Sequence, residues 1–445
     1  MQDKSPLKVT LLGCGVVGSQ VAKGLISEAN HLAARIGAPV ELTSIVVRDP
    51  EEIKDPGIPK SLLTNDAEAA VDGADVVIEL FGGLEPAKTL ILRALANGSS
   101  VVTANKALLA AHGPELYAAA DAAGVDLLYE ASVGGAIPIV RPIRHSLAGD
   151  HVNRILGIVN GTTNFILDRM TTDGSAFDDA LKVAQERGFA EANPSADVDG
   201  LDAAAKAAIL ASMAFHTRVS IDDVAIEGIR GITADDVAWA AQTGQVLKLL
   251  AIAERTPTGV SVRVHPALIP AEHPLAAVRG AFNAVFVEAQ LAGPLMFYGQ
   301  GAGGVATSSA VLGDLVTVAR HRVLGGRAVG ESAYAGLAVL EPGAAVSRYQ
   351  IRMVVDDQPG VLAQVAGVLA AHHISIEKVS QTPITEDDAL SGDVSQQPNN
   401  GAATLVITTH AASGRAFAEV RAELAASPHV IDIVSVLRVE GGGNG

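Results

Sequence analysis

Short apolar runs alternate with longer helix-compatible segments along the first 130 residues of the chain. The expected strands are 8–12, 41–47, 75–80, 100–103 and 126–129, and the expected helices are 16–29, 85–96 and 107–123. Strands that alternate with helices are typical of a parallel, doubly wound sheet. We therefore predict a Rossmann-type α/β domain over residues 1–131.

The pattern changes in the middle of the chain. Apolar strand-like runs occur at 154–159, 259–264 and 284–291, and helices are expected from near Phe165 and over 201–213. This pattern predicts a mixed α+β domain over 132–304. We expect this domain to hold the substrate and the dimer contacts.

A second glycine cluster, 299–305, precedes an apolar-periodic helix at 308–320. We expect this segment to return to the nucleotide domain and complete it with residues 305–325, with Gly303 near the cofactor. A flexible connection is the alternative, given the density of glycine.

The last hundred residues contain a third pattern. Strands are expected at 349–355, 374–381, 404–409 and 430–439, and helices at 361–371 and 414–426. The order βαββαβ predicts a ferredoxin-like domain over 346–440. The polar stretch 382–401 is expected to be a mobile insertion, and 441–445 a disordered tail.

Composition narrows the class of protein. The net charge of −17 in 445 residues argues against nucleic acid or an anionic membrane as the main partner. No apolar stretch is long enough for a membrane span, and the first residues do not resemble a signal peptide. The single cysteine, Cys14, excludes an intramolecular disulfide framework. We expect a cytoplasmic protein.

A glycine motif follows the first expected strand. Gly13, Gly15 and Gly18 form a GxGxxG pattern between that strand and a helix, with Val16 and Val17 inside it. In this context the glycines allow a tight turn, close approach of a pyrophosphate, and close helix packing, while the helix start attracts phosphate. The motif predicts a dinucleotide site; a plain glycine-rich turn is the alternative.

The second strand ends in Arg48 and Asp49, where a Rossmann domain meets the adenosine ribose. An acid there favours the 2′-hydroxyl of NAD, whereas an arginine can pair with the 2′-phosphate of NADP. Arg48 comes first and Lys54 lies nearby, so we favour NADPH, with NADH possible. An ordinary solvated strand end is the alternative.

Two further carboxyl-end stretches face the expected cleft. Gly82 and Gly83, which have no side chains, follow one expected strand, and Lys106 follows the next. Ligands bind outside the carboxyl ends of such strands, so Lys106 is expected beside the nicotinamide. A surface lysine at a helix start is the alternative.

The richest chemistry lies between Gly188 and Lys206, which includes Glu191, Asp197 and Asp202. Asp202 and Lys206 are spaced to share one face of the expected helix. An acid and a base held together beyond an acidic loop suit proton transfer. The alternative is an exposed ion pair of little energetic value.

Two turns have more than one interpretation. Residues 130–138, EASVGGAIP, can bind a monovalent cation through oxygen ligands or form a tight crossover between domains. Residues 160–164, NGTTN, form a polar turn that caps the helix expected near Phe165.

Taken together, these motifs resemble those of monofunctional homoserine dehydrogenases with a C-terminal ACT domain, over nearly the whole chain. The resemblance rests on the motifs GCGVVG, TANKA at 103–107, EASVGGAIP, NGTTN and the DQPG loop at 357–360. It also rests on the spacing of Ala184, Gly188, Asn193, Pro194, Asp197, Gly200, Asp202 and Lys206. The insertion between the second and third strands of the ACT-like domain departs from the family pattern.

The resemblance implies reversible NAD(P)-dependent interconversion of L-aspartate 4-semialdehyde and L-homoserine. Lys206 is then expected to exchange the proton with the substrate oxygen, and Lys106 to bind or polarise that oxygen. Glu191 and Asp202 are expected to hold the substrate's amino and hydroxyl groups. Asp197 is expected to order the neighbourhood and pair with the lysines.

The resemblance also implies a structural Na⁺ site at the Glu130 carboxylate and the carbonyls of Val133, Gly135 and Ile137. The ACT-like domain implies an amino-acid effector, most simply threonine, near 357–360 between paired domains, and hence a homodimer or homotetramer. Two alternatives stay open: an amino-acid-sensing protein, or an oxidoreductase acting on another amino-acid aldehyde.

Overall fold

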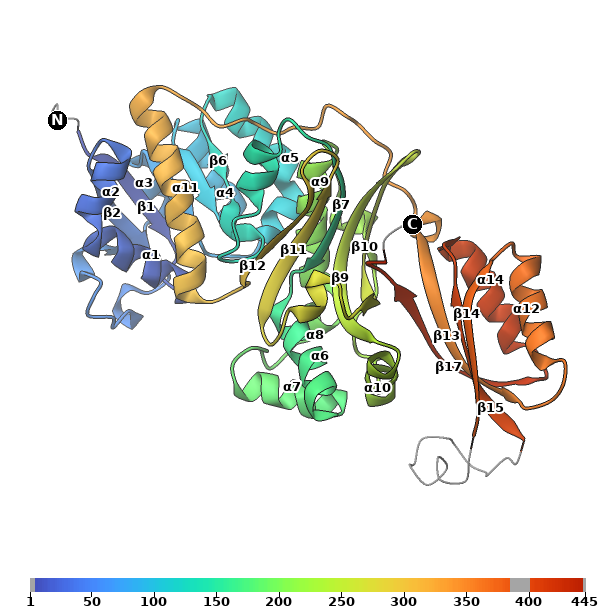
Figure 1. The fold of residues 1–445 in the computed structure, drawn as a ribbon. Coiled ribbons are helices and arrows are strands. Elements are labelled where there is room, and N and C mark those ends of the chain that lie inside the picture. The colour runs from blue at the N-terminus through green and yellow to red at the C-terminus, as the bar shows by residue number, and fades with distance from the viewer. Residues whose placement is uncertain (1–4, 385–400, 443–445) are drawn as a thin grey trace.

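The N-terminal domain of the computed structural model, which describes residues 5–384 and 401–442, is a Rossmann-type sheet (Figure 1). Six parallel strands lie in the order β3-β2-β1-β4-β5-β6. The strands are β1 (Leu7–Leu12), β2 (Val40–Val46), β3 (Leu63–Thr64), β4 (Val76–Glu79), β5 (Ser100–Thr103) and β6 (Leu127–Leu128). The helices are α1 (Val16–Ser27), α2 (Ala29–Ile36), α3 (Ala67–Asp72), α4 (Ala87–Ala96) and α5 (Lys106–Ala123). The predicted doubly wound sheet is confirmed, with β3 as an addition.

Helix α11 (Gly304–Leu324) crosses back to this domain and packs against α1 (Figure 1). The approach is close: a Cβ atom at Gly304 would lie 2.5 Å from the Val16 carbonyl oxygen, and one at Gly24 would lie 2.9 Å from Leu312. The second glycine cluster therefore lies beside the first glycine loop, which the alternative of a flexible connection does not explain.

The middle domain contributes a long mixed sheet with helices against it. Its strands are β7 (Val152–Ile158), β8 (Ala225–Ile226), β9 (Gln245–Thr256), β10 (Gly259–Pro270), β11 (Phe282–Ala289) and β12 (Gly293–Gln300). Its helices are α6 (Gly161–Asp173), α7 (Phe177–Glu186), α8 (Ser195–Val198), α9 (Leu201–Ala214) and α10 (Ala234–Gln242). The mixed α+β prediction is confirmed, but β8, β9 and β12 were not predicted. The start of α6 near Phe165 was wrong, because the Asn160 side chain caps the helix four residues earlier.

The C-terminal domain has the predicted βαββαβ order, with α12 and α14 on one face of its sheet (Figure 1). Its elements are β13 (Val346–Asp356), α12 (Val361–Ala371), β14 (Ile376–Pro383), β15 (Ala402–Thr409), the short β16 (Ala412–Ser413), α14 (Gly414–Ala425) and β17 (Val430–Val439). The expected mobile stretch 382–401 falls mainly on residues 385–400, and the expected disordered tail on 443–445, which lie outside the described residues.

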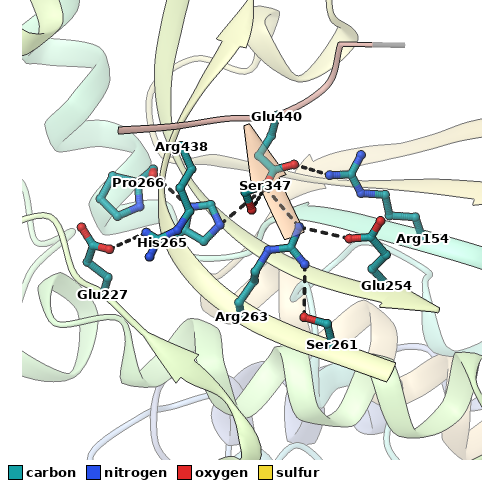
Figure 2. Close-up of polar contacts among 10 residues, drawn as sticks. All are labelled: Arg154, Glu227, Glu254, Ser261, Arg263, His265, Pro266, Ser347, Arg438 and Glu440. Carbon is teal, nitrogen blue, oxygen red and sulfur yellow. Dashed lines mark hydrogen bonds and ion pairs between the residues drawn. The ribbon is translucent and has the colours of Figure 1, made fainter. Parts of the chain in front are cut away.

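The last strand joins the two sheets into one. Strand β17 pairs antiparallel with β13 and also parallel with β10, where Leu268 lies opposite Val439. Directly after β17, the buried Glu440 contacts Arg154 and Arg263 of the middle domain (Figure 2). The sequence did not predict this continuous sheet.

Candidate active site

Helix α9 holds the Asp202 and Lys206 side chains against each other. Lys206 Nζ lies 2.7 Å from Asp202 Oδ2 and donates a second bond of 2.7 Å to the Val159 carbonyl oxygen. Only 11% of the Lys206 side chain and 10% of the Asp202 side chain are exposed. The alternative of an exposed ion pair is therefore wrong, because both partners are buried between elements.

Lys106 reaches the same carboxylate from the nucleotide domain. It is the first residue of α5, whose start is capped by the Asn105 side chain on the Leu108 N–H at 3.1 Å. Its Nζ lies 2.9 Å from Asp202 Oδ1, and 41% of its side chain is exposed. Asp202 thus bridges two lysines that come from different domains.

The charge state of Asp202 follows from this geometry. Burial alone would raise its pKa, but Lys206 and Lys106 outweigh burial and hold the pKa well below its ordinary value. The Asp202 carboxylate is therefore ionised at neutral pH and fixes the positions of both lysine nitrogens.

Asn160 is a site residue, although the sequence predicted only that it belongs to a turn that caps a helix. Its Nδ2 donates to Asp197 Oδ1 at 2.7 Å and to Asp202 Oδ2 at 2.9 Å, while its Oδ1 accepts from the Thr163 N–H at 2.9 Å. A polar turn directly after the buried strand β7 was the available signal, because such a turn lies at the strand's carboxyl end.

Asp197 does not pair directly with a lysine, contrary to our expectation. Within the described part of the chain it has no ion pair, and its carboxylate accepts from Asn160 instead. Burial raises the pKa of Asp197, and the Asn160 bond offsets only part of that increase. Asp197 therefore orders the site through Asn160.

Glu191 lies apart from this cluster. It is exposed, and its backbone carbonyl accepts from Gln185 Nε2 at 3.1 Å. No ion pair joins its carboxylate to another described residue. The structure therefore leaves the carboxylate free for a ligand without bringing it onto the lysines.

The first glycine loop has the shape that a pyrophosphate requires. Gly13 has φ +104°, and a Cβ at Gly18 would lie 2.1 Å from the Gly13 carbonyl oxygen. At Gly15, the residue before α1, a Cβ would meet nothing within 4 Å. Val16 and Val17 open the helix, and Val16 is 76% exposed. The start of α1 is thus open to an anion.

A buried glutamate that the sequence analysis missed supports the second glycine turn. Glu79, fully buried at the end of β4, accepts from the Phe81 N–H at 2.8 Å, the Gly82 N–H at 3.1 Å and the Thr103 hydroxyl at 2.6 Å. Gly82 and Gly83 both have φ +73°, and Asn105 Nδ2 donates to the Gly83 carbonyl at 2.7 Å. This turn therefore lies next to Lys106.

Arg48 and Asp49 differ in whether their side chains already have hydrogen-bond partners. Asp49 Oδ1 accepts from the Glu51 N–H at 2.9 Å and caps the following 3₁₀ turn. Arg48 is exposed, and within the described residues its guanidinium makes no ion pair or hydrogen bond. Of the two, the arginine is the freer to meet a phosphate.

The Glu130 carboxylate does not fit the expected role of cation ligand. It accepts from the N–H groups of Ile139 (2.6 Å), Val140 (2.8 Å) and Arg141 (2.9 Å), and it is 2% exposed. Glu130 instead fixes the crossover between domains.

Comparison with known proteins accounts for the whole arrangement. Residues 13–130 match the family model "Homoserine dehydrogenase, NAD binding domain", 138–316 match "Homoserine dehydrogenase", and 349–426 match "ACT domain". The chain therefore carries a nicotinamide-cofactor domain. Among the described residues, none of the helices has the length and hydropathy that a membrane crossing requires.

Relatives and solved structures agree with these matches. A homoserine dehydrogenase of Mycobacterium tuberculosis (strain H37Rv) is 50% identical and covers 99% of both chains; one of Corynebacterium glutamicum is 48% identical and covers 98% of this chain and 96% of that protein. A homoserine dehydrogenase structure from Thiobacillus denitrificans has a TM-score of 0.90 at 36% identity, covering 100% of both chains. A hyperthermophilic archaeal homoserine dehydrogenase in complex with NADPH has a TM-score of 0.60 at 26% identity, covering 71% of this chain and 98% of that one. These matches remove the alternatives of a sensor protein and of another aldehyde oxidoreductase.

Proposed function

Because this chain belongs to the homoserine dehydrogenase family, we propose that the Lys106–Asp202–Lys206 cluster performs the proton transfer in the interconversion of L-aspartate 4-semialdehyde and L-homoserine. A bound nicotinamide cofactor, which the loop of Gly13, Gly15 and Gly18 would hold, would supply the hydride for reduction of the aldehyde and accept it in oxidation. The carbonyl oxygen gains negative charge as the hydride arrives and then needs a proton.

Lys206 is the proposed proton donor in reduction and base in oxidation. Two of its N–H groups point at Asp202 and the Val159 carbonyl, so the nitrogen is fixed with one position left for the substrate oxygen. Lys106 has Asp202 as its one ion-pair partner among the described residues and is more exposed, which suits a group that binds and polarises the oxygen. The bridging carboxylate is the observation that carries this proposal.

The remaining polar groups are proposed to hold the substrate. The exposed Glu191 carboxylate would bind the substrate ammonium, and Asp202 the hydroxyl. Asp197 would keep the Asn160 amide directed at Asp202.

Replacement of Lys206 by alanine tests the proton-transfer role. We expect kcat to fall by about 10²–10⁴-fold, the usual contribution of a positioned acid or base, with nearly unchanged NADPH affinity. Lys182→Ala on the exposed side of α7 is the matched control and should keep full turnover. Steady-state rates at 340 nm and NADPH titration measure both quantities. Turnover of Lys206→Ala within a few-fold of the parent enzyme would show that another group moves the proton.

We also propose NADPH as the preferred cofactor through Arg48, with NADH as the weaker one. For the Na⁺ site, oxygen donors of the right kind remain at the carbonyls of Val133, Gly135 and Ile137, so a structural Na⁺ would be held by the backbone and not by the Glu130 carboxylate. No step of the reaction depends on this ion.

Regulation and assembly complete the proposal. The ACT domain suggests an amino-acid effector, and we propose threonine, bound near 357–360 between paired ACT domains of a homodimer or homotetramer. The acidic composition favours a cytoplasmic enzyme without nucleic-acid partners.

A further inference from the structure

Lys248 is a buried lysine that lies outside the cluster of Lys106, Asp202 and Lys206. Only 1% of it is exposed, and within residues 5–384 and 401–442 no carboxylate lies close enough to form an ion pair with its ammonium. Burial lowers the pKa of Lys248 to about 8, and the charge of Asp168 offsets part of that effect, so the ammonium is charged at neutral pH. A buried charge without an ion-pair partner is unfavourable, so its position needs a physical reason.

Lys248 lies where the sheet loses a strand. Strand β7 lies between β11 and β9, and it ends at Ile158, where the chain turns into α6 (Figure 1). Because Gly157 pairs with Ala251 in the antiparallel register of β7 and β9, continuing that register places Lys248 beside the turn at Asn160. The dipole of α6 disfavours a cation at this end of the helix, so the helix itself does not attract the ammonium.

Hydrogen bonds join the ammonium to the first turn of α6. Lys248 Nζ donates to Asn164 Oδ1 at 2.9 Å and to the Val278 carbonyl oxygen at 2.6 Å. The Nδ2 group of the same Asn164 amide donates to the Gly280 carbonyl oxygen at 2.8 Å. Lys248 and Asn164 therefore tie the turn before β11 to the start of α6.

The first turn of α6 has close contacts on two sides. A Cβ atom at Gly161 would lie 2.7 Å from the Ala281 carbonyl oxygen, so the helix start lies directly against the turn before β11. The Thr162 hydroxyl donates to the Phe189 carbonyl oxygen at 2.6 Å. The start of α6 is thus held between that turn and the loop that leads to Asp202.

The same helical turn carries the amide that orients the catalytic carboxylate. The Asn164 N–H donates to the Asn160 carbonyl oxygen at 3.2 Å. Asn160 Nδ2 in turn donates to Asp197 Oδ1 at 2.7 Å and to Asp202 Oδ2 at 2.9 Å. A shift of the start of α6 would therefore move the Asn160 amide relative to Asp202, and Asp202 fixes both catalytic lysines.

We propose that Lys248 is a positioning residue for the dehydrogenase reaction. Its ammonium holds the start of α6 through Asn164, and thereby keeps the Asn160 amide where it orients Asp202. The inference rests on the proposed function of Asp202 between Lys106 and Lys206. Lys248 itself contacts neither lysine, so its effect on turnover is transmitted through the two asparagines.

Replacement of Lys248 by methionine removes the charge and the N–H donors but keeps an unbranched side chain. Asn164 Oδ1 and the Val278 carbonyl oxygen then lose their donor. We expect kcat to fall by about 10–10²-fold, as small displacements in active sites can cause, with KM for NADPH nearly unchanged. Asn164→Ala breaks the same connection from the helix side and should lower kcat similarly, which keeps the test available if Lys248→Met does not fold.

Leu250→Ala is the matched control for loss of stability. Leu250 is fully buried and is the next residue on the same face of β9. This variant should have a lower melting temperature but the kcat of the parent enzyme. Rates at 340 nm per folded enzyme, with melting temperatures from calorimetry, separate an effect on positioning from an effect on folding.

A double-mutant cycle with Asn160→Ser tests the route of the effect. Serine keeps the cap of α6 but has no amide nitrogen for Asp202. If Lys248 acts through Asn160, Lys248→Met should lower kcat much less in the Asn160→Ser enzyme than in the parent. A merely structural function predicts instead that the two losses multiply.

Two results would overturn this inference. One is a kcat within a few-fold of the parent in both Lys248→Met and Asn164→Ala. The other is an equal fold-loss from Lys248→Met in the parent and in Asn160→Ser. The proposed proton transfer is tested separately by Lys206→Ala, so a failure of either proposal can be distinguished from a failure of the other.

Discussion

The oxygen and the nitrogen of the Asn160 side-chain amide have different functions. Its oxygen caps α6 and its nitrogen binds both Asp197 and Asp202. The polar turn and its capping function follow from the sequence, because an asparagine before a helix satisfies an otherwise free N–H. Its second function does not follow from the sequence, because Asp197 and Asp202 lie far from Asn160 along the chain. Glu79 was not predicted as a site residue either, because in the sequence it is a single polar residue in an apolar strand.

Arg48 decides between the two cofactors if its guanidinium meets the 2′-phosphate. Arg48→Ala should raise KM for NADPH by tenfold or more, about the worth of one charge-assisted hydrogen-bond pair, and change KM for NADH little. Initial rates with each cofactor measure this. Asp49→Ala provides the contrast: it removes a turn cap, so it should affect both cofactors alike. Equal effects of Arg48→Ala on both cofactors would remove the 2′-phosphate argument.

At the scale of elements, the buried strands β4 and β5 were predicted from their short apolar runs, and so was helix α9, whereas strand β9 was not. Helix α9 was placed within one residue, because an alanine-rich run follows the turn at Gly200. Strand β9 was missed: seven consecutive residues of it, from Leu247, are buried, so no alternation of apolar and polar positions appears. One of them is Lys248, and burial lowers the pKa of its ammonium to about 8.

Helix α11 is attached to the domain crossover by a group of charges that sequence spacing does not reveal. Asp314 accepts from the Glu130 N–H at 2.7 Å and from Arg141 Nη2 at 3.0 Å. The Arg141 guanidinium is shared, because its Nε also lies 3.2 Å from the Glu130 carboxylate. Burial is the main cause that raises the pKa of Asp314 to about 7, despite Arg141.

This raised pKa predicts how stability depends on pH. An unfolded aspartate titrates near 4, so the folded state binds the proton more tightly, and folding stability falls as pH rises from about 4 to about 7. Asp314→Asn imitates the protonated carboxyl and should escape that loss. Its melting temperature relative to the parent enzyme should therefore rise between pH 5 and pH 8.

Thermal unfolding across this pH range, with Asp178→Asn on the exposed face of α7 as control, tests the prediction. The control should follow the parent enzyme at every pH. A constant difference between Asp314→Asn and the parent from pH 5 to pH 8 would mean that Asp314 does not change its protonation there.

At the scale of the whole molecule, local patterns predicted three domains but not their union. The register that joins Leu268 to Val439 links residues far apart in sequence, and neither strand carries a local mark of its second partner. The ion pairs of Glu440, directly after β17, also join residues far apart in sequence. Glu440 lies next to Arg154 and Arg263, and Arg263 Nη2 lies 3.1 Å from Glu440 Oε1 (Figure 2). The ACT domain is thus part of the same sheet that supports the active-site elements.

The Glu440 carboxylate is a buried charge at the junction between these domains. Burial alone would raise its pKa, but Arg263 and Arg154 hold it below the ordinary value. His265, 3.7 Å away, adds no charge at neutral pH, because burial lowers its pKa to about 3. Glu440→Gln keeps the shape but leaves the half-buried Arg154 facing a neutral amide and the buried Arg263 with Glu254 as its remaining carboxylate. Removing one partner of a buried ion pair typically costs about 3–5 kcal/mol.

We therefore expect Glu440→Gln to lower the melting temperature by several degrees and to separate the unfolding of the ACT domain from that of the other domains. Calorimetric scans should show two transitions where the parent enzyme shows one. Glu341→Gln is the matched control, because Glu341 is 84% exposed and lies 3.8 Å from Arg415. An ion pair that exposed contributes little to stability, so this variant should melt like the parent. A single unshifted transition in Glu440→Gln would mean that the other contacts between these domains, among them the β10–β17 pairing and the Arg352–Asp236 ion pair, hold them together without the Glu440 charge.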